Sequence, residues 1–297
     1  ILIAFFTVMF AALIIRVFPL SIVEHRKFVL AAERQHQIVE VLPSTRGAIF
    51  IQDKSGGLKP LALQKIFFTL VAVPQDITDP ARAARGLAEI LIRPEGEILD
   101  KLAKSGDPYE IIAKKLDDDT AAKIEQLNLN GLSLVEETRR VYPNGTLAAA
   151  LVGFVGYQDN IEEGKYGIEK QYDGNLKGAG GFFSGEKDNS GYWLTLGRRI
   201  LNPPVNGANL VLTIDANIQF KVEEELKALQ EKWNGESSLA IIFEPKTGRI
   251  LALASRPSYD PNLYSQEKDF SVFRMPAVDS QFELGSVFKP ITMAAGI

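Results

Sequence analysis

Residues 209–254 (NLVLTIDANIQFKVEEELKALQEKWNGESSLAIIFEPKTGRILALA) decide the fold of the C-terminal part of the chain. The first six predict a β-strand, and apolar side chains then recur at helical spacing as far as Trp233. Asp215 stands where a helix N-cap is expected. Two further apolar runs flank a turn at residues 245–248 and predict a hairpin. A helix beside an antiparallel sheet indicates the α+β class, and we expect an incomplete domain over residues 207–297.

The composition limits the chemistry that the chain can perform. It has 297 residues and no cysteine, which excludes thiolate nucleophiles, thiolate zinc sites and disulfides. Its two histidines, His25 and His36, lie near the start, so a Ser-His-Asp triad in the body of the chain is excluded. A net charge of −4 with mixed signs predicts no nucleic-acid partner. An apolar share of 46% excludes disorder as the main state and favours more than one domain.

A serine followed three residues later by a lysine is the remaining kind of catalytic pair, because positions i and i+3 share one face of a helix. The spacing occurs at Ser184–Lys187, Ser265–Lys268 and Ser286–Lys289. Only the third has glycine before the serine, and proline and the apolar run ITMAA (291–295) after the lysine. Ser286 is therefore the candidate nucleophile and Lys289 the candidate general base. The simpler alternative is a serine helix cap beside a solvated lysine.

The chemistry of such a pair requires burial. A serine hydroxyl is a poor nucleophile until a base removes its proton. A lysine can act as that base only if its pKa falls from ~10.4 towards ~7, which disfavours the ammonium form by about 4–5 kcal/mol. We expect the helix that begins at Ser286 to need a covering sheet. In residues 1–297 alone, we expect its apolar face and Lys289 to stay exposed.

The N-terminal end predicts a membrane segment. Residues 1–15 are apolar except for Thr7, and at about 1.5 Å per residue they cover roughly 22 Å of a ~30 Å hydrocarbon core. We interpret residues 1–20 as a truncated transmembrane helix whose upstream part is missing, with a buried core helix or a cleaved signal peptide as alternatives. Residues 21–45 keep a helical pattern to about Val41 and are predicted to form a juxtamembrane stalk.

Residues 46–206 mix strand-like runs with amphipathic helical patterns, which predicts an irregular α+β domain. Strands are predicted at residues 48–51 and 67–73, and helices at 81–91, 98–104, 109–116 and 120–127. The stretch NPPVNG at 202–207 is typical of a linker.

The residues around Ser286, FELGSVFKP at 282–290, closely resemble the nucleophile motif of the class B penicillin-binding proteins. Four further blocks follow the order of that family. They are RGAI (46–49), VYP (141–143) with LAAALVG (147–153), GIEKQYD (167–173), and LTID (212–215) with EPKTGRILA (244–252). Five blocks in one order are much more specific than a single Ser-x-x-Lys pair.

The resemblance implies an architecture and an activity. The parts would be the transmembrane helix, a dimerisation-type pedestal over residues 46–206, and the start of a β-lactamase-like serine transpeptidase domain over residues 207–297. The implied reaction crosslinks peptidoglycan stem peptides ending in D-Ala-D-Ala through an acyl-enzyme. Ser286 would be the nucleophile and contribute its N–H to the oxyanion hole, Lys289 would be the base, and β-lactams would acylate the same serine.

The resemblance also implies partners and a location. The expected partner is a polytopic membrane glycan polymerase, and neither metal nor organic cofactor is implied. The expected location is the bacterial cytoplasmic membrane, with a single pass and the bulk of the chain on the outer side.

Some residues depart from the family pattern, and other functions stay open. Leu284 replaces a common proline, and QDKSG (52–56) replaces the commoner D-R-N-G. The family's later S-x-N and K-T-G motifs do not follow Ser286 here, and the KTG at 246–248 is predicted to be a non-catalytic hairpin turn. The alternatives are a β-lactamase, a membrane β-lactam sensor, and a non-catalytic partner or allosteric regulator of a glycan polymerase.

Overall fold

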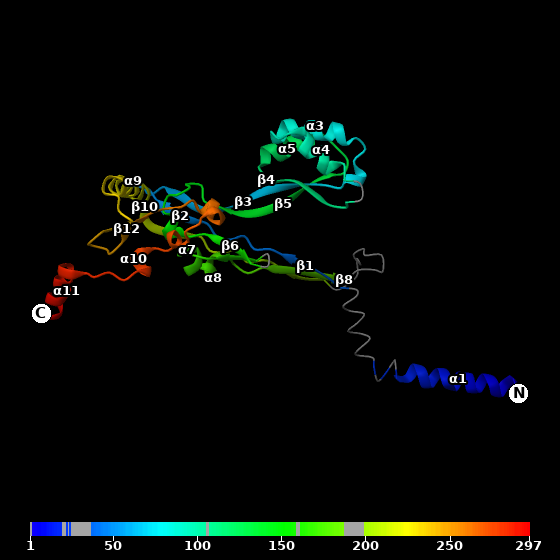
Figure 1. The fold of residues 1–297 in the computed structure, drawn as a ribbon. Helices are drawn as coiled ribbons and strands as arrows, with labels where there is room; N and C mark the ends of the chain where they lie inside the picture. The colour runs from blue at the N-terminus through cyan, green and yellow to red at the C-terminus, as the bar shows by residue number, and fades with distance from the viewer. Residues whose placement is uncertain are drawn as a thin grey trace. The chain divides into compact units, whose positions relative to one another are not determined.

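Figure 1 shows the computed structural model, which describes residues 2–19, 22, 24, 37–104, 107–158, 161–186 and 199–297. Helices and strands are mixed along these residues, which confirms the predicted α+β class. The chain divides into two compact units. The first comprises Ile1–Thr45 and Gly178–Gly207, and the second comprises Arg46–Lys177 and Ala208–Ile297.

The prediction of a membrane-spanning helix over residues 1–20 is corrected by the structure. Helix α1 runs over Leu2–Phe18 and has 17 residues, which gives a length of about 25 Å. Among the described residues, no helix combines the length and the apolar character needed to cross a bilayer. The single-pass location at the bacterial cytoplasmic membrane, which rested on that helix, is corrected with it.

The first unit contains a three-stranded antiparallel sheet in the order β1–β8–β9. The strands are Gln37–Leu42, Gly181–Glu186 and Arg199–Asn202. The predicted helix as far as Val41 is therefore wrong for residues 37–41, where the β-branched residues of QIVEVL favour a strand. Residues 25–36 of the predicted stalk lie outside the described residues. Ser184 lies in β8, and Lys187 also lies outside the described residues.

The second unit is built on a five-stranded sheet around the long strand β3 (Leu58–Ala72). Strand β2 (Ile49–Gln52) pairs antiparallel with the first part of β3, and β4 (Glu110–Leu116) pairs with its last part. Strand β5 (Leu132–Val141) pairs along residues 63–72 of β3. Strand β10 (Leu210–Asp215) adds to β2 in parallel.

Three helices cover the β3–β4–β5 part of this sheet (Figure 1). They are α3 (Pro80–Leu91), α4 (Glu95–Leu102) and α5 (Asp118–Gln126), and the short turn η2 (Pro74–Asp76) precedes them. Asp79 and Asp117 cap α3 and α5 by accepting backbone N–H groups. The helix predicted at 109–116 is wrong, because residues 110–116 form β4, where pairing with β3 overrides the helical spacing.

The predicted strand, helix and hairpin of residues 209–254 are confirmed as β10, α9 (Ala216–Trp233), β11 (Ser238–Phe243) and β12 (Ile250–Arg256). The Asp215 carboxylate caps α9 by accepting the N–H groups of Asn217 and Ile218. The hairpin β11–β12 is a separate two-stranded sheet, because β10 pairs with β2 instead of with the hairpin. Strand β10 thus follows the predicted linker but adds to the sheet that contains β2, which precedes the linker.

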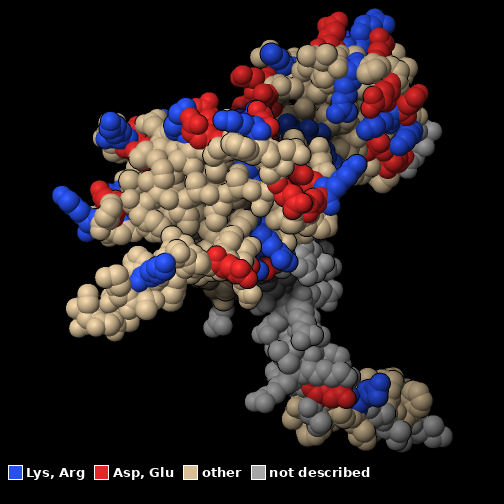
Figure 2. Space-filling view, turned by 60° about the vertical axis from the view of Figure 1, so that its left-hand side comes forward, with Lys and Arg blue, Asp and Glu red and all other residues tan. Residues whose placement is uncertain are grey.

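A second core joins residues from both sides of the predicted linker. Ile49, Phe154 and Leu176 pack in one apolar cluster with Leu253 and Phe273. The elements around this core are α6 (Ala149–Val152), β6 (Val155–Gln158), β7 (Ile161–Gly164), α7 (Gly167–Gln171), α8 (Asp173–Leu176), η3 (Pro261–Gln266), η4 (Phe270–Phe273) and α10 (Pro276–Asp279). On the face shown in Figure 2, basic and acidic side chains are interspersed.

Candidate active site

Ser286 and Lys289 lie one turn apart on a continuous helical path. Ser286 belongs to η5 (Gly285–Phe288), a 3-10 helix of one turn, and Lys289 is the first residue of α11 (Lys289–Ala295). The N–H of Lys289 donates to the carbonyl of Ser286. Gly285 takes a φ of +54°, a conformation that favours glycine, and Pro290 lies in the first turn of α11. The structure therefore places the candidate nucleophile and base at neighbouring positions on one turn.

Both side chains are exposed, as is every residue from Val278 to Ile297. Ile291 and Met293 of α11 expose 56% and 69% of their surface. Within the part of the chain that the structure describes, no hydrogen bond or ion pair reaches the Ser286 hydroxyl or the Lys289 ammonium. The expectation that α11 and Lys289 stay exposed in residues 1–297 is thus confirmed.

The segment that carries Ser286 leaves the core at an aromatic cluster. The Phe273 ring meets the rings of Phe154 and Tyr259 edge-on, each at 4.8 Å between centroids. Phe154 also stacks on Tyr264 at 4.2 Å. Met275 is the last buried residue before Ser286. Because Phe154 precedes the predicted linker, residues on both sides of the linker fix the point from which the Ser286 segment departs.

Side-chain amides tie the same regions together. Asn262 donates to the Tyr142 carbonyl at 2.8 Å and accepts the Tyr142 N–H at 3.0 Å. In the same way, Gln219 donates to the Leu253 carbonyl at 3.0 Å and accepts the Leu253 N–H at 2.9 Å. Each amide thereby supplies both hydrogen bonds that a neighbouring strand would offer. Neither amide was predicted from the sequence.

Helix α9 presents a buried carboxylate next to Gln219. Glu223 accepts the N–H of Ala148 and an amide N–H of Gln219, both at 2.7 Å. Burial raises the pKa of the Glu223 carboxyl, although both hydrogen bonds act in the opposite direction. Gln219 and Glu223 lie on the helix face that also buries Ala216 and Leu226. Polar residues at core positions of the helical pattern were the signal that could have identified them.

A buried ion-pair cluster holds the residues before the linker. Both oxygens of the Glu169 carboxylate are used: one accepts from Arg46 at 2.8 Å and the other from Arg140 at 2.7 Å. The side chains of Arg46, Arg140 and Glu169 are 1%, 2% and 0% exposed. Asp173 bonds the Arg46 guanidinium at 2.7 Å. Burial acts to raise the pKa of Asp173, but the Gly164 N–H and Arg46 bring that pKa below its ordinary value.

Tyr142 extends this cluster. Its hydroxyl accepts the Val155 N–H at 2.9 Å and donates to Glu169 at 3.4 Å. Burial, with the negative charge of Glu169 acting in the same direction, raises the pKa of this phenol well above its ordinary value. Residues from three of the sequence blocks, 46–49, 141–143 and 167–173, therefore meet in one place, which their spacing in the sequence did not reveal.

The other serine–lysine and K-T-G matches lie elsewhere. Ser265 lies in η3, which ends at Gln266, so Lys268 is not on the same helical turn. Residues 246–248 form the turn between β11 and β12, closed by the Gly248 N–H on the Glu244 carbonyl at 2.9 Å. The predicted hairpin turn is confirmed.

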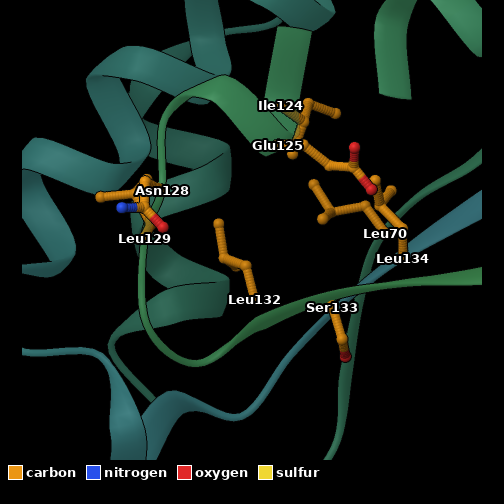
Figure 3. A pocket seen from close by; sticks show the side chains of 8 residues that line it. All are labelled: Leu70, Ile124, Glu125, Asn128, Leu129, Leu132, Ser133 and Leu134. Carbon is orange, nitrogen blue, oxygen red and sulfur yellow. The ribbon is translucent and has the colours of Figure 1, made fainter. Parts of the chain in front are cut away.

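Three pockets of the described residues are lined by neither Ser286 nor Lys289. Figure 3 shows a pocket of about 290 Å³ beside α5 and β5. Its side chains are mostly apolar, with the Glu125 carboxylate as its one charged group: Leu70, Ile124, Glu125, Asn128, Leu129, Leu132, Ser133 and Leu134. Among the described residues, no cluster of three or more histidine, aspartate or glutamate side chains is arranged to hold a metal ion.

Two family models match the chain. The model described as the penicillin-binding protein dimerisation domain matches residues 41–212, and the model described as the penicillin-binding protein transpeptidase domain matches residues 238–297. Ser286 and Lys289 fall within the second match. Together the two matches leave only the first 40 residues and residues 213–237 outside.

Curated relatives have similar sequences over most of this chain. Stage V sporulation protein D of Bacillus subtilis is 33% identical over 250 residues, which cover 83% of this chain and 38% of the relative. The probable peptidoglycan D,D-transpeptidase PenA of Neisseria gonorrhoeae is 30% identical, covering 98% and 49%. The peptidoglycan D,D-transpeptidase FtsI of Escherichia coli is 30% identical, covering 97% and 48%. The chain thus spans half the length of these relatives or less.

Solved structures share the fold. A peptidoglycan synthetase from Bifidobacterium adolescentis aligns with a TM-score of 0.57 at 27% identity, covering 87% of this chain and 51% of that one. Penicillin-binding protein 2X from Streptococcus thermophilus aligns with a TM-score of 0.61 at 22% identity, covering 78% and 37%. The second likeness supports the fold alone.

Proposed function

Because the chain belongs to the class B penicillin-binding proteins, we propose that the whole protein is a peptidoglycan D,D-transpeptidase with Ser286 as nucleophile and Lys289 as general base. One observation carries this assignment. The turn that sets Ser286 and Lys289 three positions apart lies within the residues that the transpeptidase family model matches. Relatives named D,D-transpeptidases favour this activity over a β-lactamase, a β-lactam sensor or a non-catalytic regulator.

In the proposed reaction, the Ser286 hydroxyl oxygen attacks the carbonyl carbon of the penultimate D-Ala while the neutral Lys289 amine takes the hydroxyl proton. The Ser286 N–H donates to the oxyanion. The peptide bond then breaks, and terminal D-Ala leaves with the proton from Lys289. The amine of a second stem peptide attacks the ester, its proton returns through Lys289 to the serine oxygen, and the crosslink is formed. A β-lactam would react in the first step and remain attached to Ser286.

We assign the pedestal to residues 46–206 and the first part of a β-lactamase-like transpeptidase domain to residues 207–297. The two family matches support this division. A lysine that acts as a base must be kept neutral by burial, and Lys289 is exposed here. Since the chain spans half the length of its curated relatives or less, the proposed activity is that of the full-length protein.

We also propose a polytopic membrane glycan polymerase as the partner. A transpeptidase consumes glycan strands that carry uncrosslinked stem peptides, and a polymerase is the class of enzyme that produces such strands. Binding of the full-length protein to a candidate polymerase, measured with both purified in detergent, tests this partnership.

Labelling of the full-length protein with a fluorescent penicillin tests the nucleophile. We expect one covalent adduct, which peptide mapping by mass spectrometry places on Ser286. Ser286→Ala should abolish the adduct, and the matched variant Ser265→Ala should retain it. An adduct on Ser265 or Ser184, or none at all, would overturn the proposal.

A further inference from the structure

A hydrogen bond between two side chains connects the β6–β7 hairpin to the long strand β3. The hairpin is a separate two-stranded sheet, and Glu162 of β7 accepts an N–H of the Gln64 amide in β3 at 2.8 Å. The second oxygen of each group, Gln64 Oε1 and Glu162 Oε1, is buried and has no hydrogen-bond partner among the described residues. The two joined groups therefore contain two buried acceptors that lack a donor.

Rotation of the amide does not remove this mismatch. An amide offers one acceptor oxygen and an NH₂ donor, whereas an ionised carboxylate offers two acceptors and no donor. In either orientation of the Gln64 amide, one oxygen of each group lacks a donor. A protonated carboxyl group is the complement of an amide, because its O–H donates to the amide oxygen while its carbonyl oxygen accepts the amide N–H. The contact thus fits the neutral form of Glu162 and not the ionised form.

The charges around Glu162 favour the same neutral form. The cations that act on Glu162 are the guanidinium groups of Arg46 and Arg140. Both already pair with Glu169, at 2.8 and 2.7 Å, and Arg46 also pairs with Asp173 at 2.7 Å. Two positive charges are therefore balanced by two carboxylates, and an ionised Glu162 would add a third negative charge.

Burial has the largest influence on the Glu162 carboxyl group and raises its pKa above the ordinary value. The negative charge of Glu169 acts in the same direction, whereas the two arginines and the hydrogen bond from Gln64 act in the opposite one. Tyr157 of β6 is paired with Glu162 across the hairpin, and burial raises the pKa of its phenol, which therefore stays neutral. In the described part of the chain, Nη2 of Arg140 is a buried donor without a partner, and it is the alternative partner for an ionised Glu162.

We propose that Glu162 carries a proton that holds the β6–β7 hairpin on β3, so that the hairpin is held under mildly acidic conditions and loosens as the pH rises. In the neutral state, the Glu162 O–H donates to Gln64 Oε1. When the proton leaves to solvent, that hydrogen bond is lost and the carboxylate turns to Nη2 of Arg140. The groups involved all lie within residues 41–212, which the dimerisation-domain model matches. The proton site is therefore independent of the chemistry proposed for Ser286.

Hydrogen exchange of the full-length protein, measured by mass spectrometry, tests the proposal. An acid whose pKa is raised in the folded state stabilises that state fully below its ordinary pKa, about 4.3 for glutamate, and this contribution is lost as the pH rises to the raised value. We expect the protection of residues 155–164, corrected for the intrinsic exchange rate, to fall between about pH 5 and 8. The fall should reach at most about tenfold per pH unit, which is the limit for release of one proton.

Two variants assign the proton to its group. Glu162→Gln should make the protection independent of pH, because its amide donates to Gln64 Oε1 throughout the range. The matched control is Glu163→Gln, on the same strand, since Glu163 is half exposed and pairs with Lys165 at 2.5 Å. This control should keep the pH dependence of the wild-type protein.

Three results would overturn the proposal. Equal protection of the wild-type hairpin throughout this pH range would show that no proton is released from the contact. A pH dependence that survives in Glu162→Gln would assign the proton to another group. If Glu162→Gln were less protected than the wild-type protein at about pH 5, the ionised carboxylate, bound to Nη2 of Arg140, would be what holds the hairpin.

Discussion

Glu169→Gln should strongly destabilise the second unit, because it removes the charge that balances two buried arginines. Glu169 is fully buried, and its two oxygens serve Arg46 and Arg140 at 2.8 and 2.7 Å. In the variant, Arg46 keeps Asp173, whereas Arg140 keeps only the Gly47 carbonyl at 2.8 Å. The new amide NH₂ group would also face a guanidinium donor. Removal of one partner from a buried ion pair costs about 3–5 kcal/mol.

Urea unfolding, monitored by far-UV circular dichroism, measures this loss in the free energy of unfolding. In thermal unfolding, at about 2–4 °C per kcal/mol for a unit of this size, the melting temperature should fall by roughly 6–20 °C. Glu163→Gln is the matched control, since Glu163 is also paired with a cation, Lys165, but is 51% exposed. An exposed pair contributes about 0–1 kcal/mol. If the two variants lost equal stability, the charges of the cluster would not be what holds this region together.

Three further predictions concern other residues. Lys289→Arg should abolish penicillin labelling of the full-length protein at unchanged melting temperature, since a guanidinium cannot deprotonate; retained labelling would indicate another base. Glu223→Gln should gain stability relative to wild type as pH rises from about 4 to 8, because the raised pKa of Glu223 makes its stabilising contribution greatest when protonated; melting temperatures with parallel pH profiles would contradict this. Gly153→Ala should cost more than the roughly 1–3 kcal/mol of a strained backbone, because φ is +75° and the added carbon would lie 1.9 Å from the Tyr166 carbonyl oxygen. Gly145→Ala, with open space around it, should cost less in the same urea titration.

Local sequence signals predicted the elements whose residues agree with their surroundings. The strand, helix and hairpin of residues 209–254 each combine a regular apolar spacing with a cap or turn residue, and all four elements are present. Residues 109–116 show where local spacing fails. Their apolar positions fit a helix, but β4 pairs with β3, which lies far away in the sequence, as in the pair Leu70 and Ala113. No local pattern records such a pairing.

The candidate site was predicted in part. The position of Ser286 and Lys289 on one turn follows from spacing alone and is present. The amide of Asn262 was missed, because a side chain in a short turn that bonds a distant backbone leaves no periodic trace in the sequence, whereas Gln219 occupies a core position of the α9 pattern.

The blocks that indicated the family do not all report on the chemistry. Residues 46–49 contact 167–173 through Arg46 and Glu169, and β10, which contains the block at 212–215, lies in parallel beside β2. Tyr142 of the block at 141–143 donates to Glu169 and is bound by Asn262. The stretches at 46–49, 141–143 and 167–173 thus meet at one buried polar cluster, and β10 adds to the neighbouring sheet, whereas residues 282–290 carry the proposed nucleophile. The activity proposed for the full-length protein rests on Ser286 and Lys289, whereas the fold of this region rests on the ion pairs around Glu169.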